Sequence, residues 1–200
     1  MYYETNKEEM QAMMNMPGEI RGSTFDTDKK FILKKGGKKK LGEVEGETSE
    51  MGHALYYNKT KSKEFYPWGE KVLSLLAISR VFNMDKGKVK EIGNFALQTS
   101  FLGKLFTRYL LSTKNTFERE AKIWRKSSTV GRLEVVSVDE KQKTVTIRLY
   151  NVNFHPIVCD YLEGYFKAVG QMKKGEVATC EETRCYFKGE DTFHEFLLTW

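Results

Sequence analysis

The chain has 200 residues, of which 40% are hydrophobic and 13% aromatic, and it carries a formal net charge of +6. This much apolar surface can form a packed core, which excludes a chain that is disordered throughout. No apolar run reaches the ~20 residues that a membrane-spanning helix needs, and residues 1–16 lack the pattern of a signal peptide. We therefore expect a cytoplasmic protein with no membrane span.

The first residues differ from the rest, and we expect residues 1–18 to form an N-terminal arm. Met10, Ala12, Met13 and Met14 are expected to form the apolar side of a short helix, which Pro17-Gly18 ends. No internal repeat or low-complexity linker divides the remaining residues. We therefore expect one further domain with a helical part and a sheet part, which are residues 19–200, divided into 19–129 and 130–200.

The region after the arm is rich in lysine and glycine. Ser23 or Thr24 is expected to cap a helix, because a side-chain oxygen there can accept a hydrogen bond from an unpaired amide, and Gly36-Gly37 is expected to end it. Residues 45–51 are predicted to be an exposed loop. Five lysines between Lys34 and Lys40 form the densest basic cluster. We interpret it as a solvated loop between two short helices, and we expect no nucleic-acid binding.

Further helices are predicted up to the start of the sheet. Pro67 suits the first turn of a strongly apolar helix that runs to Val81, because its missing amide would be unpaired there anyway. Asp85 is expected to cap the next helix, whose apolar pattern continues to Leu110. A last helix is predicted within residues 113–126.

The C-terminal part, from Gly131 to Trp200, shows two kinds of hydrophobic pattern. Apolar and polar residues alternate over residues 133–149, as in half-buried strands. An amphipathic helix is predicted over His155–Gly170, and two further strands are predicted at Glu176–Phe187 and Thr192–Trp200. The predicted fold class is α+β, with a helical N-terminal half packed on a four-stranded antiparallel sheet of ββαββ order.

Short motifs occur in a particular order from about residue 20 to residue 200: Arg21-Gly22-Ser23, Phe65-Tyr66-Pro67, Gly93 within Ile-Gly-Asn-Phe-Ala, Gly131-Arg132-Leu133, Cys159 to Tyr165, Glu182-Thr183-Arg184-Cys185, Gly189 and Phe196 to Trp200. In this order the chain resembles the haem-NO-binding and 4-vinyl-reductase-like ligand-binding superfamily, whose fold is shared with Golgi transport-complex subunits. The resemblance implies a small-molecule pocket between the helices and a concave sheet face. Gly164 fits this fold, because a residue without a side chain lets the crossover helix approach the sheet closely.

The resemblance also raises the question of haem. The haem-binding members hold iron through a histidine on the helix just before the sheet and carry a Tyr-x-Ser-x-Arg motif for the propionates. Residues 113–130 contain no histidine, and Tyr109-Leu-Leu-Ser112 has the wrong spacing and no following arginine. We therefore expect no haem and no other cofactor.

A metal site is the next hypothesis. The 4-vinyl-reductase-like relatives have a late Cys–Gly–Cys pattern, which Cys185 and Gly189 match, with His194 in place of the second cysteine. With Cys180 these residues would suit zinc, which needs about four ligands, and Cys159 is a distant fourth. Because Cys180 and Cys185 are an odd number apart, a regular strand would direct them to opposite faces. The sequence favours cysteines that act as buried apolar fillers.

Catalysis has weaker support. His155 and Cys159 lie four residues apart, a spacing that could pair a thiol with an imidazole on one helix face, but no third orienting group is evident. We interpret Glu163 and Glu181-Glu182 as surface charge and expect no enzymatic activity.

The favoured hypothesis is a non-enzymatic sensor or regulatory protein that binds a small apolar or aromatic ligand and forms a homodimer. Such sites are usually apolar with a few polar groups, and the predicted lining is aromatic: Tyr66, Trp68, Phe95, Phe106, Trp124 and Tyr165. The alternatives are a protein-interaction module, to which the methionines of residues 10–16 would contribute an adaptable contact, and nucleic-acid binding through the lysines.

Overall fold

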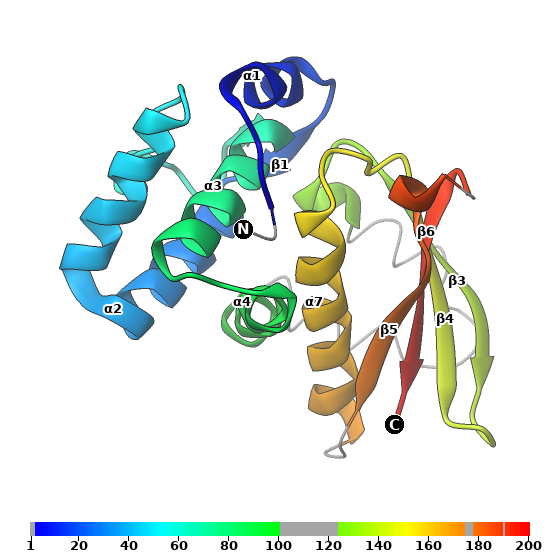
Figure 1. The fold of residues 1–200 in the computed structure, drawn as a ribbon. Coiled ribbons are helices and arrows are strands. Elements are labelled where there is room, and N and C mark those ends of the chain that lie inside the picture. Colours follow the sequence, from blue (N-terminus) through cyan, green and yellow to red (C-terminus); the bar gives the residue numbers. More distant parts are fainter. Residues whose placement is uncertain (1–2, 101–123, 175–177, 190) are drawn as a thin grey trace.

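A computed structural model describes residues 3–100, 124–174, 178–189 and 191–200 of the chain (Figure 1). It is an α+β structure, as predicted. Its elements are α1 (Lys7–Asn15), β1 (Glu19–Arg21), α2 (Ser23–Glu50), β2 (Phe65–Pro67), α3 (Trp68–Val81), α4 (Lys86–Thr99), β3 (Arg132–Asp139), β4 (Thr144–Tyr150), α7 (Ile157–Lys174), β5 (Thr179–Arg184), a 3-10 turn (Tyr186–Lys188) and β6 (Phe193–Thr199).

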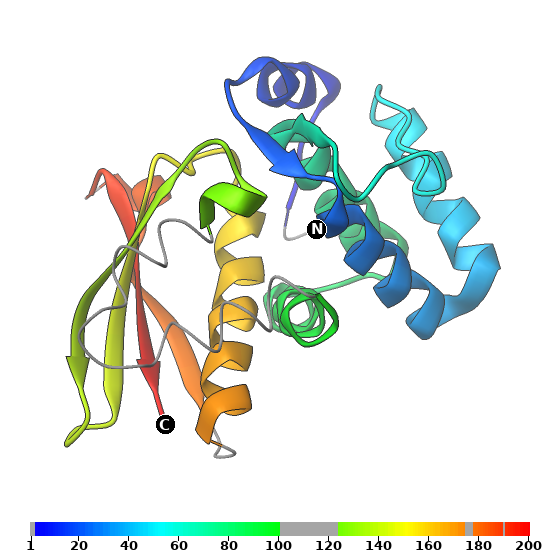
Figure 2. The same ribbon diagram turned by 180° about the vertical axis from the view of Figure 1, so that it is seen from behind.

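The C-terminal half forms the predicted four-stranded antiparallel sheet, with strand order β3-β4-β6-β5. Period-two alternation explains its single buried face, because in β4 every second residue is buried and its neighbours are partly exposed. Ile147 of β4 pairs with Phe196 of β6 at the centre of this face, and both are fully buried. Helix α7 crosses this face of the sheet (Figures 1 and 2).

Helix α7 lies between the sheet and the helical half, and α4 packs against its other side (Figure 2). Two glycines permit this contact. A Cβ atom on Gly164 would lie 1.8 Å from the carbonyl oxygen of Lys90, and one on Gly93 would lie 1.8 Å from the carbonyl oxygen of Tyr161. The prediction that Gly164 allows close approach to the sheet is therefore wrong about the partner, because the helix that it allows to approach is α4. Gly170 faces the sheet instead, beside Leu198.

Helix α2 differs from the prediction. It continues from Ser23 to Glu50 through a kink at Gly37, where φ is 69° and ψ is −166°, values that glycine tolerates. The lysine cluster thus lies on this helix and not in a loop, and the loop predicted for residues 45–51 is largely helical. Neither Ser23 nor Thr24 caps the helix, since the N-cap residue is Gly22 and makes no side-chain hydrogen bond. The predicted cap of α4 is present, because the Asp85 side chain accepts a hydrogen bond from the amide of Lys88.

The predicted arm packs on the domain. Asn6 and Glu9 form a capping box at the start of α1, and the buried residues Met10 and Met13 join the same hydrophobic core as α3. Gly69 of α3 lets the two helices touch, since a Cβ atom there would lie 2.8 Å from the carbonyl oxygen of Met13. The apolar side of α1 is therefore used within its own chain.

Some predictions lie outside the described residues. These are the continuation of the α4 pattern to Leu110, most of the helix predicted within residues 113–126, and Phe106. Residues 124–127, at the end of that segment, are helical. Within the described residues, no helix is long and apolar enough to cross a membrane.

Candidate functional site

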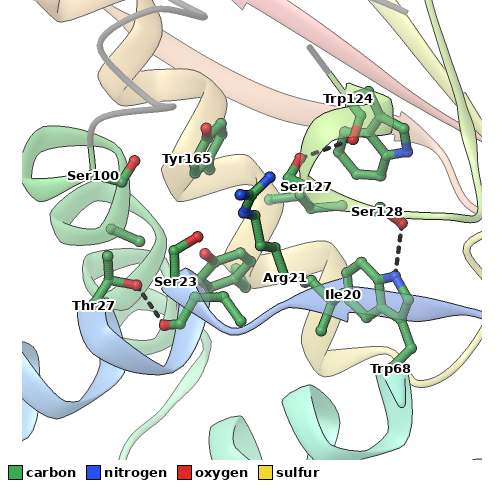
Figure 3. Close-up of a pocket in the computed structure, with 14 residues that line it drawn as sticks. Ile20, Arg21, Ser23, Thr27, Trp68, Ser100, Trp124, Ser127, Ser128 and Tyr165 are labelled. Carbon is green, nitrogen blue, oxygen red and sulfur yellow. Dashed lines mark hydrogen bonds between the residues drawn. The ribbon is translucent and has the colours of Figure 1, made fainter. Parts of the chain in front are cut away.

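A pocket of about 90 Å³ lies between the helical half and α7 (Figure 3). Its walls come from β1, the first turns of α2, the start of α3, the end of α4, α7 and residues 124–128. The described residues that line it do not include any from the four-stranded sheet. The pocket thus differs from the one that the resemblance implies, because α7 stands between it and the sheet.

Two tryptophans form the aromatic wall, and hydrogen bonds fix both indoles. Trp68 donates from Nε1 to the hydroxyl of Ser128 at 2.9 Å, and its ring stacks on Phe154. Trp124 donates from Nε1 to the carbonyl oxygen of Val130 at 2.8 Å. Because each indole N–H has a partner, both rings can be buried without a desolvation penalty at nitrogen.

One charged residue lines the pocket among the described residues, and it is Arg21 (Figure 3). Its guanidinium donates to the carbonyl oxygen of Lys126 at 3.2 Å and lies 5.9 Å from the ring centroid of Phe65. Ser23 and Tyr165 also line the pocket. Burial raises the pKa of the Tyr165 phenol, which keeps this group neutral.

The structure brings together three of the six predicted lining residues, namely Trp68, Trp124 and Tyr165. Tyr66 lies elsewhere: its ring packs edge-on against Phe25, and its hydroxyl accepts a hydrogen bond from the amide of Lys61.

Two further predicted lining residues are not part of this pocket as described. Phe95 packs against Phe31 and lines a separate groove between α2 and α4. Phe106 lies outside the described residues. Arg21, in contrast, lines the pocket although it was absent from the predicted lining.

A second cluster joins the start of α7 to the β5–β6 hairpin. Its members are Cys159, Glu182, Cys185 and His194, and the candidate ligand atoms of all four lie within 4.8 Å of one another. The first is in the first turn of α7, and the others lie on β5, just after it and on β6. Two thiols, an imidazole and a carboxylate form a ligand set that suits tetrahedral zinc.

Two distances within this cluster fit tetrahedral zinc. The Sγ atoms of Cys159 and Cys185 are 3.9 Å apart, and Sγ of Cys159 lies 3.5 Å from Nδ1 of His194. Tetrahedral bonds of about 2.3 Å to sulfur and 2.05 Å to nitrogen would separate these pairs by about 3.8 Å and 3.6 Å. Glu182 already contacts the imidazole, with Oε1 at 2.8 Å from Nδ1. Small side-chain shifts would therefore place all four around one ion.

The protonation state of the two thiols in the cluster depends on whether a cation is bound. Burial, followed by the Glu182 carboxylate, raises the pKa of the Cys159 thiol, and burial raises the pKa of Cys185. Without a cation the thiols are therefore protonated, whereas a bound metal would take them as thiolates. A groove of about 540 Å³, lined in part by Cys159, Glu182 and Cys185, opens beside the cluster and gives an ion a route to it.

The sequence predicted Cys185 and His194 as ligands and named Cys159 as a distant fourth candidate, whereas Glu182 was not among the predicted ligands. Cys180 lies outside the cluster, as the odd spacing between the two cysteines suggested. Glu182 is not the free surface charge that was predicted, because only 10% of its side chain is exposed and it contacts His194. Glu163 is also buried and not a surface residue: its Oε1 accepts a hydrogen bond from the Glu182 amide at 2.6 Å, and its other oxygen pairs with Lys90.

The predicted pair of His155 and Cys159 is not assembled. The Nδ1 atom of His155 accepts a hydrogen bond from the amide of Ile157, and Nε2 contacts the hydroxyl of Thr5, both at 3.1 Å. Since both ring nitrogens are occupied, this imidazole is not available to activate the thiol.

No protein-family model matches the chain, and no curated protein matches it either. Several solved structures, however, are similar to this chain. An H-NOX protein from S. oneidensis, in the Fe(II) ligation state, is 15% identical, with a TM-score of 0.64 over 90% of this chain and 95% of that one. The H-NOX protein from K. algicida is 13% identical, with a TM-score of 0.62 over 90% and 96%. The chain therefore has an H-NOX-like fold.

Proposed function

We propose that this protein is a non-enzymatic sensor or regulatory module that binds a small molecule in the pocket between the helical half and α7. The observation that carries the proposal is the convergence of Trp68, Trp124 and Tyr165 on one cavity. Fixed aromatic walls with a few polar groups are the usual form of a small-molecule site. The fold supports the same interpretation, because its structural neighbours are H-NOX proteins.

Haem does not fit the residues of this chain. All three histidines lie within the described residues, and none lines the pocket. His155 bonds to Thr5 and Ile157, His194 lies in the cysteine cluster, and the largely exposed His53 faces Glu70. The pocket volume of about 90 Å³ is also well below the ~300–1,000 Å³ of clefts that hold larger ligands. We propose that the protein uses the fold without haem.

We further propose that Cys159, Glu182, Cys185 and His194 hold a structural zinc ion. The ion would crosslink α7 to the β5–β6 hairpin, and all four ligands would come from the protein, as in sites that stabilise a fold. This proposal adds a metal to the expectation of no cofactor. Its support is that the distances from Cys159 to Cys185 and to His194 match tetrahedral zinc geometry.

A pocket-filling variant tests the ligand proposal. Ala96 lines the pocket and is buried, so Ala96→Leu should occupy the space while Ala96→Ser keeps it open. The probes are butyrate, phenol and toluene, added to the full chain and followed by tryptophan fluorescence and saturation-transfer NMR. At least one probe should bind the natural chain and the serine variant but not the leucine variant. Absence of binding by every probe, with no bound species in native mass spectrometry, would overturn the proposal.

The protein-interaction alternative receives less support. The methionines of residues 10–16 were expected to supply its contact surface, but Met10 and Met13 are buried in the core of their own chain, and Met14 and Met16 pack partly buried against it. The homodimer stays a prediction, and sedimentation of the chain with and without residues 1–18 tests it.

A further inference from the structure

We propose that the ligand of this pocket is a short-chain monocarboxylate, and that the guanidinium of Arg21 binds its carboxylate group. This inference rests on the proposed function, because it names the chemical class of the ligand for the same pocket. It is carried by the placement of Arg21, its hydrogen-bond partners and the size of the cavity.

Arg21 occupies a position from which it can meet a ligand. It is the last residue of β1, and Figure 3 shows its guanidinium among the lining side chains, between Ser127 and Tyr165. The described lining contains no aspartate or glutamate. The pocket therefore carries one positive charge from its own side chains and favours an anionic ligand.

Most hydrogen-bond donors of Arg21 are unused. A guanidinium has five N–H donors, and within the described residues its polar partner is the carbonyl oxygen of Lys126, with no carboxylate in contact. The nearby Ser23 hydroxyl has no hydrogen-bond partner of its own in the same part of the chain. A carboxylate could accept two parallel hydrogen bonds from Arg21 and a third from Ser23, which is a strong and directional arrangement.

A second cation near the pocket, Lys71, differs from Arg21 in having a carboxylate partner. Behind the pocket wall formed by Tyr161, the Lys71 ammonium is fully buried and is neutralised by both carboxylate oxygens of Asp28, at 2.7 and 2.8 Å. In that pair the protein itself supplies the counter-charge of a fully buried cation. Arg21 is only half-buried and has no carboxylate partner in the described residues, so its guanidinium is left available for the carboxylate of a ligand.

The cavity limits the size of the ligand. Its volume of about 90 Å³ is smaller than the ~150 Å³ cavity that accommodates benzene. Trp68, Ala96 and Leu162 are apolar residues of the lining, and they suit an aliphatic tail. A second carboxylate would remain buried without a partner, which is costly. These limits favour acids such as propionate and butyrate over dicarboxylates and larger aromatic acids.

Pairs of acids and their neutral amides test the inference. Propionate and butyrate are compared with propionamide and butyramide, which have the same shape without the charge, by titration calorimetry and tryptophan fluorescence on the full chain. Arg21→Met removes the charge at similar length, and Arg21→Lys keeps the charge without the bidentate geometry. In the natural chain we expect the acids to bind at least tenfold more tightly than the amides. The ratio should fall to about one in the methionine variant and to an intermediate value in the lysine variant.

The outcomes separate this inference from the proposed function. Acids and amides that bind equally well to the natural chain would overturn the carboxylate assignment and leave the pocket as a ligand site. If neither acids nor amides bind, and Ala96→Leu does not alter the binding of any probe of the earlier test, the proposed function fails as well. If Arg21→Met does not fold by circular dichroism, the acid-to-amide ratios of the natural chain and of the lysine variant decide. A ratio near one in the natural chain would then refute the inference.

Discussion

Lys71 and Asp28 form an ion pair in which neither side chain has exposed surface, with Nζ at 2.7 and 2.8 Å from the two carboxylate oxygens. Ser74 donates a further hydrogen bond to the same carboxylate, and the ring of Tyr161 lies 4.4 Å from Nζ. Desolvation by burial lowers the pKa of Lys71, and the Asp28 carboxylate opposes this effect. The pair therefore connects α2, α3 and α7 inside the core.

Removing one partner of this ion pair should destabilise the fold more than replacing both partners by apolar residues. Lys71→Met leaves the Asp28 carboxylate buried without its counter-charge, and we expect the free energy of unfolding to fall by about 3–5 kcal/mol. The double variant Lys71→Met with Asp28→Leu leaves no charge behind and should recover much of that loss. Urea unfolding followed by circular dichroism measures both. A single variant within about 1 kcal/mol of the natural chain would show that the pair is not buried as described.

The metal proposal makes a prediction about individual cysteines. Purified protein should contain one zinc ion per chain by elemental analysis, and Cys159→Ser or Cys185→Ser should reduce this to a small fraction. Cys180→Ser is the matched control, because Cys180 lies outside the cluster and the metal content should stay at one. Chelation should lower the melting temperature of the natural chain and of this control. Full zinc retention in both cluster variants would exclude the site.

Much of the fold could be predicted because its signals are local. The alternation of β4 and the amphipathic face of α7 each depend on residues close in sequence, and so does the Asp85 cap. The length of helix α2 was harder to predict, because Gly37 adopts a positive φ that introduces a kink without ending the helix. Composition alone does not distinguish a glycine that bends a helix from one that stops it.

The candidate sites were less predictable, because they depend on distances between elements. Trp68 and Trp124 could be chosen as large aromatic residues, but Phe95 lies on the side of α4 that faces α2, and the sequence does not show which side faces the cavity. Cys159 and Glu182 meet only when α7 packs beside the β5–β6 hairpin. Arg21 stood in one of the motifs that suggested the family, and its role could be seen only from the absence of a partner carboxylate in the described residues.

The close contact between α4 and α7 predicts that a glycine-to-alanine substitution lowers stability at Gly164, whereas the same substitution at an exposed glycine of another helix raises it. Gly164→Ala would place a Cβ atom 1.8 Å from the carbonyl oxygen of Lys90. The helices must then separate, at an expected cost of at least about 2 kcal/mol of unfolding free energy. Gly42→Ala is the control, because Gly42 is exposed within α2 and a Cβ atom there would have nothing within 4 Å. Alanine at this position should stabilise the protein by up to about 1 kcal/mol. Equal effects in urea unfolding would contradict the close helix contact.

His155 predicts how stability depends on pH. Burial lowers its pKa from 6.5 to about 4 in the folded chain, because the charged imidazolium is poorly solvated there, and the Glu9 carboxylate opposes this shift only in part. Between these two values the unfolded chain binds more protons than the folded one, so the free energy of unfolding decreases as the pH falls from about 6.5 to 4. Above about 6.5 the residue is neutral in both states and contributes no pH dependence.

His155→Asn keeps an acceptor for the Ile157 amide but does not titrate. Relative to this variant, the natural chain should lose about 1–2 kcal/mol between pH 6.5 and 4, after allowance for the partial exposure of the ring. Urea unfolding at several pH values measures the difference, and both proteins are compared after chelation because acid also releases metal from thiolates. Parallel pH profiles for the two proteins would show that His155 is protonated as readily in the folded chain as in the unfolded one, and hence that its ring is not buried against Thr5 and Ile157.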